Sequence, residues 1–437
     1  MDEGTQQAAR GGVPWLAAKA PDRDLMRLAV AAVFVLLGLL GGVSWANHRA
    51  RTRDWPRDTF LYTPADSYGD FLHEVAKAGK LNPYFESRPA CYFPLTYLVF
   101  AGVARWSVDR QVEAFLDLSL ALALAACLAG AVAIRGPTAK ALFLGFFAFV
   151  AWTASYPYIF AMDRGNLDPA LASLSFLAMV LLVKDRPVAA ALLLAVPAAM
   201  KGYPLGLVVV FAALGRWRCA ALTVAATAAL SAIALACFKG GLIVNWIGFR
   251  YGLYVFKYNY TLGMCSAHYC ADPLNGMKIA LRTWPGFAPR LVSFCVRHYA
   301  WFGRAGLLAC CSYTVLTKAA FHRRLLAAVL AIMLYPNVVN DYKLINLAVA
   351  LFFMATAAEP WDRGDHIRFW AVLLLLVPKN YSFISQDASI SCIVSPLLLL
   401  LVLATLFEDA TAWSQARASL AGLLARARRR APGTAAG

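Results

Sequence analysis

The sequence predicts an all-α polytopic membrane protein with about twelve transmembrane helices. Only 15% of its 437 residues are Asp, Glu, Lys or Arg and 61% are apolar, whereas about 25% of a soluble globular protein is charged. The apolar residues also come in blocks long enough for a membrane span of ~20 residues, such as Leu28–Trp45, Val112–Ile134 and Ala220–Phe238. A soluble cytosolic enzyme is therefore excluded.

The apolar blocks follow one another with two long interruptions. They are 25–46, 92–108, 112–134, 141–160, 166–183, 187–200, 203–215, 219–238, 291–317, 325–340, 343–357, 367–380 and 389–407. The polar stretches 47–91 and 239–290 separate them. Because no internal repeat or low-complexity segment divides the chain, we predict one membrane domain over 25–407, between an N-terminal tail at 1–24 and a basic C-terminal tail at 408–437.

The charges of the short loops predict the orientation. Five loops together carry eleven Lys or Arg, at 135–140, 184–186, 216–218, 318–324 and 363–368. The alternating loops carry one each, Arg164, Lys201, Lys343 and Lys379. Since short cytoplasmic loops are rich in Lys and Arg, we predict that the first set and both termini are cytoplasmic and that both polar stretches face outward. If both termini are cytoplasmic, the number of spans is even, so the thirteen blocks cannot all span separately. Either 92–108 does not cross the membrane, or 187–200 and 203–215 form one helix that is kinked at Pro204.

The basic excess of 41 Lys plus Arg over 24 Asp plus Glu fits this topology, because anionic headgroups attract cations beside the spans. No nucleic-acid-binding module accompanies the excess, so membrane lipid and not nucleic acid is the expected partner. In the second polar stretch, Cys265 and Cys270 are compatible with a disulfide or with two thiols. Only His268 lies near them as a further soft ligand, so a zinc site is not expected.

A short helix is predicted in the first outward stretch, between Pro64 and Gly79. Its apolar side chains share one face, Leu72, Val75 and Ala76. Its carboxylates repeat every four residues on another face, Asp66, Asp70 and Glu74. This pattern is typical of an amphipathic helix in the membrane interface. The carboxylates either serve a site at the membrane surface or form a solvated face, with Ser67 and Asp70 as a capping box.

Aromatic residues surround the segment CYFPL at the start of the next apolar block. They are Tyr84, Tyr92, Phe93 and Tyr97. Such residues normally form the aromatic belt of a membrane interface, and their flat faces also suit a sugar ring. The same two interpretations hold for the aromatic residues of the second outward stretch, Trp246, Tyr251, Tyr254, Tyr258, Tyr260 and Tyr269.

A charged break with the sequence MDRGNLD separates two further blocks. Gly165 permits a tight turn there, and Asn166 is expected to cap the following helix. Ionisable residues at a span entrance are costly unless they are paired or line a wet cavity. The charges of this break are Asp163, Arg164 and Asp168. They either neutralise one another or form part of a polar site.

Two later breaks, KGYP and NDYKL, each hold a lone cation, Lys201 and Lys343. A lysine near a helix end usually extends to the headgroups. Together with Arg164, however, these lysines would provide three cations at the outer ends of the helices, suited to a phosphate group. Asp341 is either the ion-pair partner of Lys343 or a member of the same polar pocket.

The order of these motifs resembles glycosyltransferase family 87. The likeness runs from Leu25 to Phe353 and comprises the first span, the outward carboxylate, the aromatic-proline motif, the Gly-Asn turn, the Lys-x-x-Pro break and the late Asp-Tyr-Lys. It implies a GT-C-like bundle of membrane helices with amphipathic interfacial helices in the outward loops. It also implies a polyprenyl-phosphate-linked sugar as donor. No cofactor is expected, and no metal is required, because a monophosphate leaving group departs without one and the first outward stretch contains no Asp-x-Asp motif.

The resemblance assigns residues as well. Asp70 stands where the family keeps its catalytic carboxylate, and Asp66 is the next candidate for that position. The motifs and the lone cations imply these substrate-binding residues, Tyr92, Arg164, Asn166, Lys201, Asp341, Tyr342 and Lys343. The chain departs from the family's patterns at Phe93, at Gly202 and near Asp341, where many members carry Trp and His. These departures leave the sugar and any histidine role open.

The expected reaction moves a hexose or pentose, mannose-like by preference, from polyprenyl phosphate to a lipid-linked or cell-envelope glycan. It would take place at the outer face of a bacterial plasma membrane, by direct displacement at the anomeric carbon. Asp70 would act as general base on the acceptor hydroxyl. Arg164, Lys201 and Lys343 would neutralise the phosphate leaving group.

Two other classes of protein remain as alternatives. A polysaccharide polymerase or ligase that uses lipid-diphosphate donors also has about twelve spans and a large outward loop. A transporter or lipid flippase would line a path with the outer charges, although such proteins place ionisable residues near mid-membrane and often contain repeats. The type of donor and the requirement for Asp70 separate these alternatives.

Overall fold

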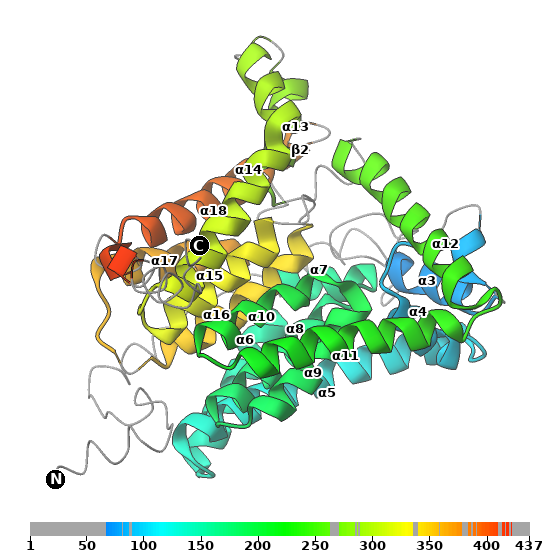
Figure 1. The fold of residues 1–437 in the computed structure, drawn as a ribbon, viewed down its shortest axis with the longest axis horizontal. Helices are drawn as coiled ribbons and strands as arrows, with labels where there is room; N and C mark the ends of the chain where they lie inside the picture. The colour runs from blue at the N-terminus through cyan, green and yellow to red at the C-terminus, as the bar shows by residue number, and fades with distance from the viewer. Residues whose placement is uncertain are drawn as a thin grey trace, which may run out of the picture.

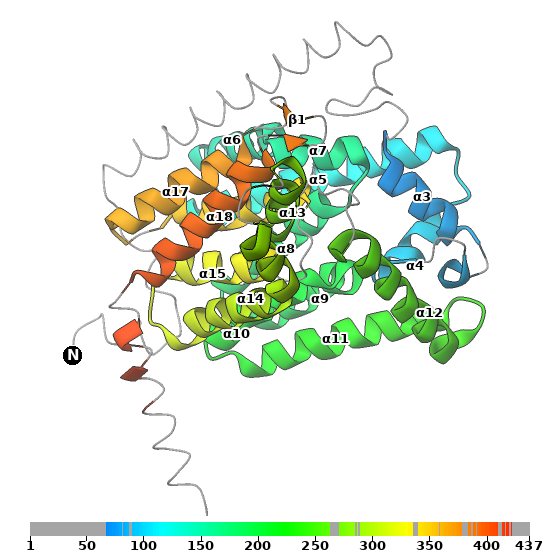
Figure 2. The ribbon, with the colours of Figure 1, turned by 90° about the horizontal axis from the view of Figure 1, so that it is seen from above.

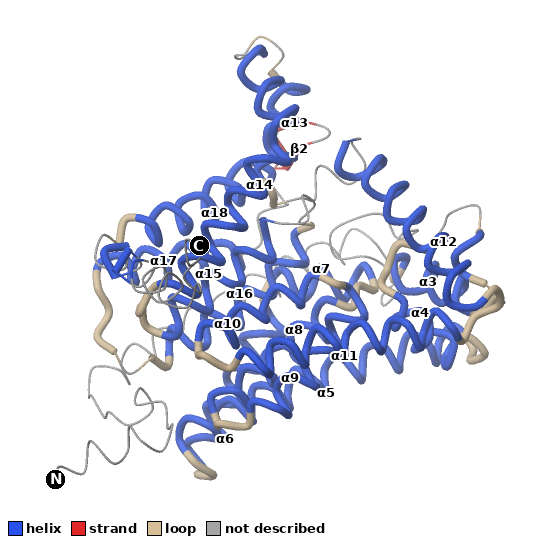
Figure 3. Tube along the Cα trace, in the orientation of Figure 1, coloured by secondary structure: helices blue, strands red, loops and turns tan. Residues whose placement is uncertain are grey.

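The computed structural model describes residues 67–421 apart from short gaps, and it is almost entirely helical (Figure 3). The gaps are 81, 87–89, 263–270, 285, 287–288, 335–339, 358, 378–382, 386–387, 390, 410–412, 416 and 419–420. The long helices are α3 (Gly69–Ala78), α4 (Pro94–Val103), α5 (Val108–Arg135), α6 (Ala139–Ala154), α7 (Tyr156–Arg164), α8 (Asp168–Val183), α9 (Pro187–Lys201), α10 (Val208–Ala213), α11 (Trp217–Ala236), α12 (Gly241–Phe256), α13 (Pro273–Thr283), α14 (Pro289–Leu316), α15 (Phe321–Leu334), α16 (Ile345–Ala355), α17 (Arg363–Leu376) and α18 (Ser391–Phe407).

Shorter elements connect these helices. They are the 3-10 turns η3 (Pro83–Phe85), η4 (Tyr203–Leu207) and η7 (Asp341–Leu344), the π-helical turn η5 (Lys257–Leu262), and the strands β1 (Phe383–Ser385) and β2 (Ala388–Ser389). The two strands pair antiparallel, with Phe383 opposite Ser389 and Ser385 opposite Ala388. The predicted first span and N-terminal tail lie outside the described residues, and so does most of the predicted C-terminal tail.

Each apolar block that falls on described residues forms one helix or a broken pair of helices, so the predicted helical elements are confirmed. Within the described ranges, α5 and α11 are long and apolar enough to cross a membrane alone. The bent pair α6 and α7 would make a third crossing, and its axis turns by 60° at Ser155. The chain is therefore a helical membrane protein with two or three clear crossings among these residues.

The break between α9 and the following turn comes at a glycine, not at Pro204 as the sequence suggested. Gly202 has φ +73, which a residue with a side chain rarely adopts. Pro204 lies inside η4, two residues later, and Pro197 is accommodated within α9. The positive φ at Gly202, and not the missing N–H of Pro204, ends α9.

The helices place two groups of loops at opposite ends of the bundle (Figures 1 and 2). α3, α4 and α12 lie at one end, and α17 and the start of α15 lie at the other, with α5, α8, α9 and α11 running between. α8 and α15 are apolar and buried nearly all round, as expected for helices at the centre of a bundle. The basic short loops meet at the second end, where Arg216 binds Asp185 at 2.7 Å.

The long polar stretch 239–290 is helical where the structure describes it. It forms α12 and α13, with η5 between them. α13 and the start of α14 project from the rest of the bundle (Figure 1). α12 keeps only its narrow face buried, including Asn245 and Phe249, and exposes Trp246, Tyr251 and Tyr254.

Candidate functional site

The outward carboxylates lie on α3, which is amphipathic as predicted but starts later and buries a different face. The helix begins at Gly69 with Tyr68 as its left-handed N-cap and no side-chain cap, so the capping box of Ser67 and Asp70 is not formed. Its buried face is Phe71, Val75 and Ala78, together with Glu74. Phe71 fits between the rings of Phe100 and Phe115, at 5.2 and 4.9 Å between centroids.

Glu74 is a structural residue and does not face the membrane surface. It is 7% exposed and accepts hydrogen bonds from Tyr97 Oη at 2.5 Å and Lys77 Nζ at 2.6 Å. The Tyr97 hydroxyl also accepts from the backbone N–H groups of Cys91 and Tyr92. Glu74 therefore ties α3 to the segment that leads into α4, and of the predicted carboxylate row on described residues only Asp70 is left for chemistry.

Asp70 is positioned by a close contact between α3 and the end of α7. The N–H of Tyr68 donates to the carbonyl of Asp163 at 2.9 Å. Gly165 has φ +69, and a Cβ atom there would lie 2.7 Å from Phe71 Cβ and 2.9 Å from the Tyr68 backbone. Because only glycine allows this approach, the Gly-Asn turn brings the first turn of α3 against the C-terminus of α7.

The Asp70 carboxylate is held from two sides. Asn166 Nδ2 donates to its Oδ2 at 2.9 Å, and Arg164 Nη2 lies 3.4 Å from its Oδ1. The Asp70 side chain is 26% exposed and that of Arg164 is 20% exposed. Asp70 is thus fixed in orientation while remaining accessible, which is the arrangement that a catalytic base requires.

Asn166 is itself held by Lys201, from the C-terminus of α9. Lys201 Nζ donates to Asn166 Oδ1 at 2.5 Å. Asn166 Oδ1 also accepts from the N–H of Asp168 at 3.2 Å, but the N-cap of α8 is Leu167 and not Asn166 as predicted, because the helix begins one residue later. The Asn166 side chain has one favourable orientation, because its oxygen accepts from the Lys201 ammonium group and its amide nitrogen donates to the Asp70 carboxylate.

The buried partner of Lys201 is Asp168, which the sequence placed in the break but not in the site. Asp168 is fully buried, and its Oδ1 accepts from Lys201 Nζ at 3.0 Å and from Tyr203 Oη at 2.8 Å. Tyr203 lies within 3.5 Å of Asn346 Nδ2 on α16. The sequence contains one indication of this role, because Asp168 is a carboxylate in the first turn of an otherwise apolar helix, where a buried carboxylate needs a cation.

The aromatic motif before α4 covers this network. The hydroxyl of Tyr92 lies 3.4 Å from Asn166 Nδ2, and the Tyr92 ring lies 4.8 Å from Lys201 Nζ. The neighbouring Phe93 ring packs on Gly202, where a Cβ atom would lie 2.3 Å from it. Phe93 and Gly202, the two departures from the family's patterns, are therefore in direct contact with each other.

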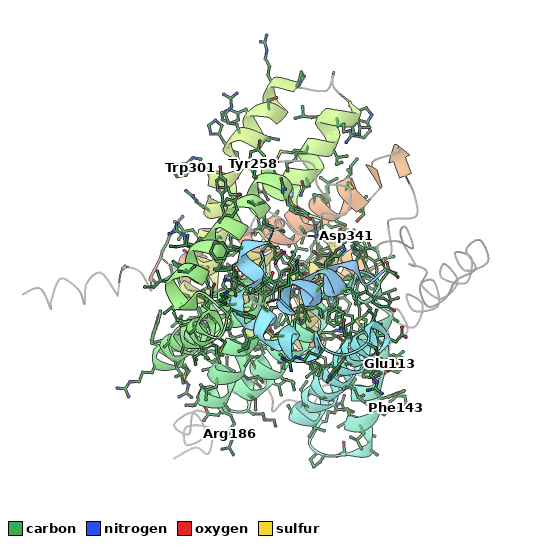
Figure 4. The ribbon with its side chains drawn as sticks, turned by 90° about the vertical axis from the view of Figure 1, so that its right-hand side faces the viewer. Glu113, Phe143, Arg186, Tyr258, Trp301 and Asp341 are labelled. Atoms are coloured by element: carbon green, nitrogen blue, oxygen red, sulfur yellow. The ribbon has the colours of Figure 1, made fainter. Side chains whose placement is uncertain are left out.

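The late Asp-Tyr-Lys motif lies on the side of this network opposite the aromatic motif. Asp341 is fully buried and accepts from Tyr156 Oη at 2.7 Å and from Ser391 Oγ at 3.1 Å. Lys201 Nζ lies 5.4 Å from the Tyr342 ring, and Lys343 Nζ lies 5.5 Å from the Tyr203 ring. Figure 4 shows Asp341 in the interior of the molecule. The motif contributes one buried carboxylate and one further cation to the same end of the bundle.

The structure thus brings together the candidate residues that it describes, at the ends of α3, α7, α8 and α9, just before α4, and in η7. Asp66, Cys265 and Cys270 lie outside the described residues. Over the ranges described, no group of three or more His, Cys, Asp or Glu could hold a metal ion.

Residues 90–336 match the model of glycosyltransferase family 87. The chain belongs to this family. A search of curated protein sequences gives no significant match. Within this glycosyltransferase, Arg164, Asn166 and Lys201 lie in the matched segment, whereas Asp70 precedes it and Asp341 follows it. A family-87 enzyme requires a sugar donor and an acceptor, and the cluster around Asp70 combines a carboxylate with cations and aromatic faces.

Proposed function

We propose that the chain transfers a hexose or pentose, mannose-like by preference, from a polyprenyl-phosphate sugar to a hydroxyl of a glycan or glycolipid acceptor. One observation carries the proposal. Asp70 is an accessible carboxylate that Arg164 and Asn166 hold at the meeting point of four helix ends. A positioned carboxylate next to a cation suits removal of a proton from one group while a phosphate departs from another.

The proposed step is a single displacement. The acceptor oxygen attacks the anomeric carbon and loses its proton to Asp70 as the new C–O bond forms. The bond between the anomeric carbon and the phosphate oxygen breaks, and its electron pair leaves with the polyprenyl phosphate. The leaving group is a lipid monophosphate that needs no protonation if cations stabilise its charge.

Arg164 and Lys343 are the cations proposed for that phosphate. Arg164 is partly exposed, and its guanidinium lies 3.4 Å from the Asp70 carboxylate, close to where a phosphate beside Asp70 would lie. Lys343 lies at the same end of the bundle, against the Tyr203 ring. Lys201 has a different role in this scheme, because Asp168 already balances its charge.

Lys201 is proposed to set the orientation of Asn166 and, through it, of Asp70. Lys201→Met is expected to lower kcat about 10- to 100-fold, the equivalent of losing a hydrogen bond to a charged group, while the Kd of the donor stays unchanged. Stopped-flow or equilibrium donor binding and steady-state transfer measure the two quantities. If donor affinity falls and kcat is retained, Lys201 binds phosphate as the sequence suggested.

A second variant separates this role from stability. Lys201→Met alone leaves the Asp168 carboxylate buried without its cation, which destabilises the fold. Lys201→Met with Asp168→Asn removes both charges of the pair. The double variant is expected to recover thermal stability and not turnover. Recovery of turnover in the double variant would show that Lys201 acts through charge balance only.

The finer topology belongs to the same proposal. We propose a GT-C-like bundle of about twelve spans in a bacterial plasma membrane, with α3, α4 and α12 at the periplasmic face. The basic loops at the opposite end of the bundle support this orientation, because such loops remain cytoplasmic. The donor lipid would enter laterally between helices, and the sugar would reach Asp70 from the outer leaflet.

The stereochemistry of the product tests the displacement. A single displacement at the anomeric carbon inverts its configuration, so an α-linked product is expected from a β-linked donor. NMR of the isolated product gives the configuration directly, and transfer is expected to persist in the presence of a chelator. A product with retained configuration would contradict the proposed step, since retention requires two successive displacements.

A further inference from the structure

α14 carries a regular face of arginine and aromatic residues that the proposed site does not use. Counting along the helix in steps of three or four, the residues on this face are Arg290, Phe294, Arg297, Trp301, Arg304 and Leu308. This spacing aligns them in one stripe. Phe294, Trp301 and Leu308 are 53%, 68% and 69% exposed, and the three arginines are exposed as well. The stripe therefore has no cover from the described part of the chain.

The charge of the stripe is not balanced locally. Residues 273–340 contain eight Lys or Arg and no Asp or Glu. Among the described residues, no ion pair involves Arg290, Arg297 or Arg304. The Arg304 guanidinium lies 5.5 Å from the Trp301 ring, which orders it without neutralising it. Three exposed cations in a row favour an anionic partner from outside the chain.

The position of the stripe limits which kind of partner can reach it. α14 has 28 residues and is therefore about 42 Å long, more than the ~30 Å of a hydrocarbon core. Its charged half belongs to the hairpin with α13 that projects from the bundle, and Trp301 lies at the rim of the molecule in Figure 4. Its apolar half, 305–316, packs on α10 and α15.

A surface pocket lies between the first two arginines. It is shallow and open to solvent, and it is lined by Pro289, Arg290, Ser293, Phe294 and Arg297. Two guanidinium groups and one hydroxyl can donate hydrogen bonds to phosphate oxygens, and guanidinium groups do so in pairs. The Phe294 ring provides an apolar wall of the kind that packs on glycerol and acyl carbons. The pocket thus combines phosphate donors with an apolar surface.

We propose that the arginine–aromatic stripe of α14 binds the phosphate headgroups of anionic phospholipids in the outer leaflet. Arginine binds the phosphates, and the interleaved aromatic rings lie at the depth of the headgroups, as in other interfacial helices. In this proposal, this half of α14 lies along the membrane surface, because Arg290 and Arg304 are 14 residues or about 21 Å apart along its axis. Each arginine then contacts a different headgroup. This binding is independent of sugar transfer and fixes how the α13–α14 hairpin lies on the membrane.

Quenching of Trp301 by brominated lipids tests the proposal in nanodiscs that contain the full chain. The Trp301 signal is the difference between the protein and its Trp301→Phe variant. We expect stronger quenching by brominated phosphatidylglycerol than by brominated phosphatidylcholine at equal mole fraction. Each arginine is expected to contribute about fivefold to this preference, which corresponds to about 1 kcal/mol.

The combined variant Arg290→Gln, Arg297→Gln and Arg304→Gln, measured against its own Trp301→Phe partner, is expected to lose the preference. The combined Lys variant at the same three positions is expected to keep most of it, and a helical circular dichroism spectrum checks the fold of both. An equal preference in the Gln variant and the wild type would overturn the proposal. So would a wild-type Trp301 that neither lipid quenches, which would indicate a protein or glycan on this face.

Discussion

Asp70→Asn is expected to lower kcat about 10²- to 10⁴-fold, the range of a lost general base, without weakening the binding of the donor. An amide of the same shape still accepts from Asn166, so the local fold is retained. It cannot take the acceptor proton. Arg164, whose guanidinium lies 3.4 Å from Asp70, keeps its positive charge in this variant, so affinity for the lipid phosphate is unchanged or higher. Transfer assays in proteoliposomes, paired with donor binding, measure both quantities.

Asp109→Asn is the matched control for this change. Asp109 is an exposed carboxylate in the first turn of α5, at the same end of the bundle, and it is not part of the cluster around Asp70. The control is expected to retain full turnover. If Asp70→Asn also retained it, the base would have to be sought elsewhere, first at Asp66.

Asp365→Asn is expected to lower the free energy of unfolding by about 3–5 kcal/mol, the cost of leaving buried cations without their partner. Asp365 is fully buried at the end of the bundle opposite the site, where it binds Arg323 at 2.5 Å and Arg368 at 2.8 Å. His322 Nε2 lies 3.3 Å from the same carboxylate. These contacts join α15 to α17. Equilibrium unfolding in mixed micelles measures the loss.

The pH dependence of the free energy of unfolding gives an independent check on the role of Asp365, which precedes the apolar part of α17. Burial raises the pKa of this carboxyl, but hydrogen bonds from His322, Arg323 and Arg368 outweigh that effect and hold the pKa well below its usual range. A depressed folded-state pKa gives stability that is present above the unfolded pKa of about 3.9 and is lost as the pH falls. The difference between wild type and Asp365→Asn should therefore shrink on acidification.

Asp185→Asn is the matched control for stability. It breaks the ion pair with Arg216, whose side chains are 42% and 51% exposed. An exposed pair contributes about 0–1 kcal/mol, so this variant is expected to unfold like the wild type. A loss for Asp365→Asn no larger than that of the control would contradict a buried structural role.

The sequence predicts the helices of this fold well because each apolar block must be helical in lipid. It predicts the buried face of α3 less well. Leu72, Val75 and Ala76 form an apolar stripe, but the fit of Phe71 between Phe100 and Phe115 rotates the helix and buries Glu74. Tertiary packing decides how α3 is rotated about its axis, because the predicted and the observed apolar faces of this helix differ little in hydrophobicity.

The cluster around Asp70 is predictable in its members and not in its pairing. Isolated charges at helix breaks identify Arg164 and Lys201, since unpaired charges are costly there, and the Gly-Asn turn identifies Asn166. The sequence does not reveal that Lys201 pairs with Asp168, because the two residues are 33 positions apart and meet only when α8 packs on α9. The packing of α4 on α9 likewise makes Phe93 and Gly202 neighbours.

Donor preference is the measurement that tests the central claim most directly. The purified chain in proteoliposomes would be supplied in turn with polyprenyl-monophosphate sugars, lipid-diphosphate sugars and nucleotide sugars, together with a glycan acceptor. We predict transfer from monophosphate donors alone, with one polyprenyl phosphate released for each sugar transferred. Transfer only from diphosphate or nucleotide donors, or release of the lipid phosphate without transfer, would contradict the account.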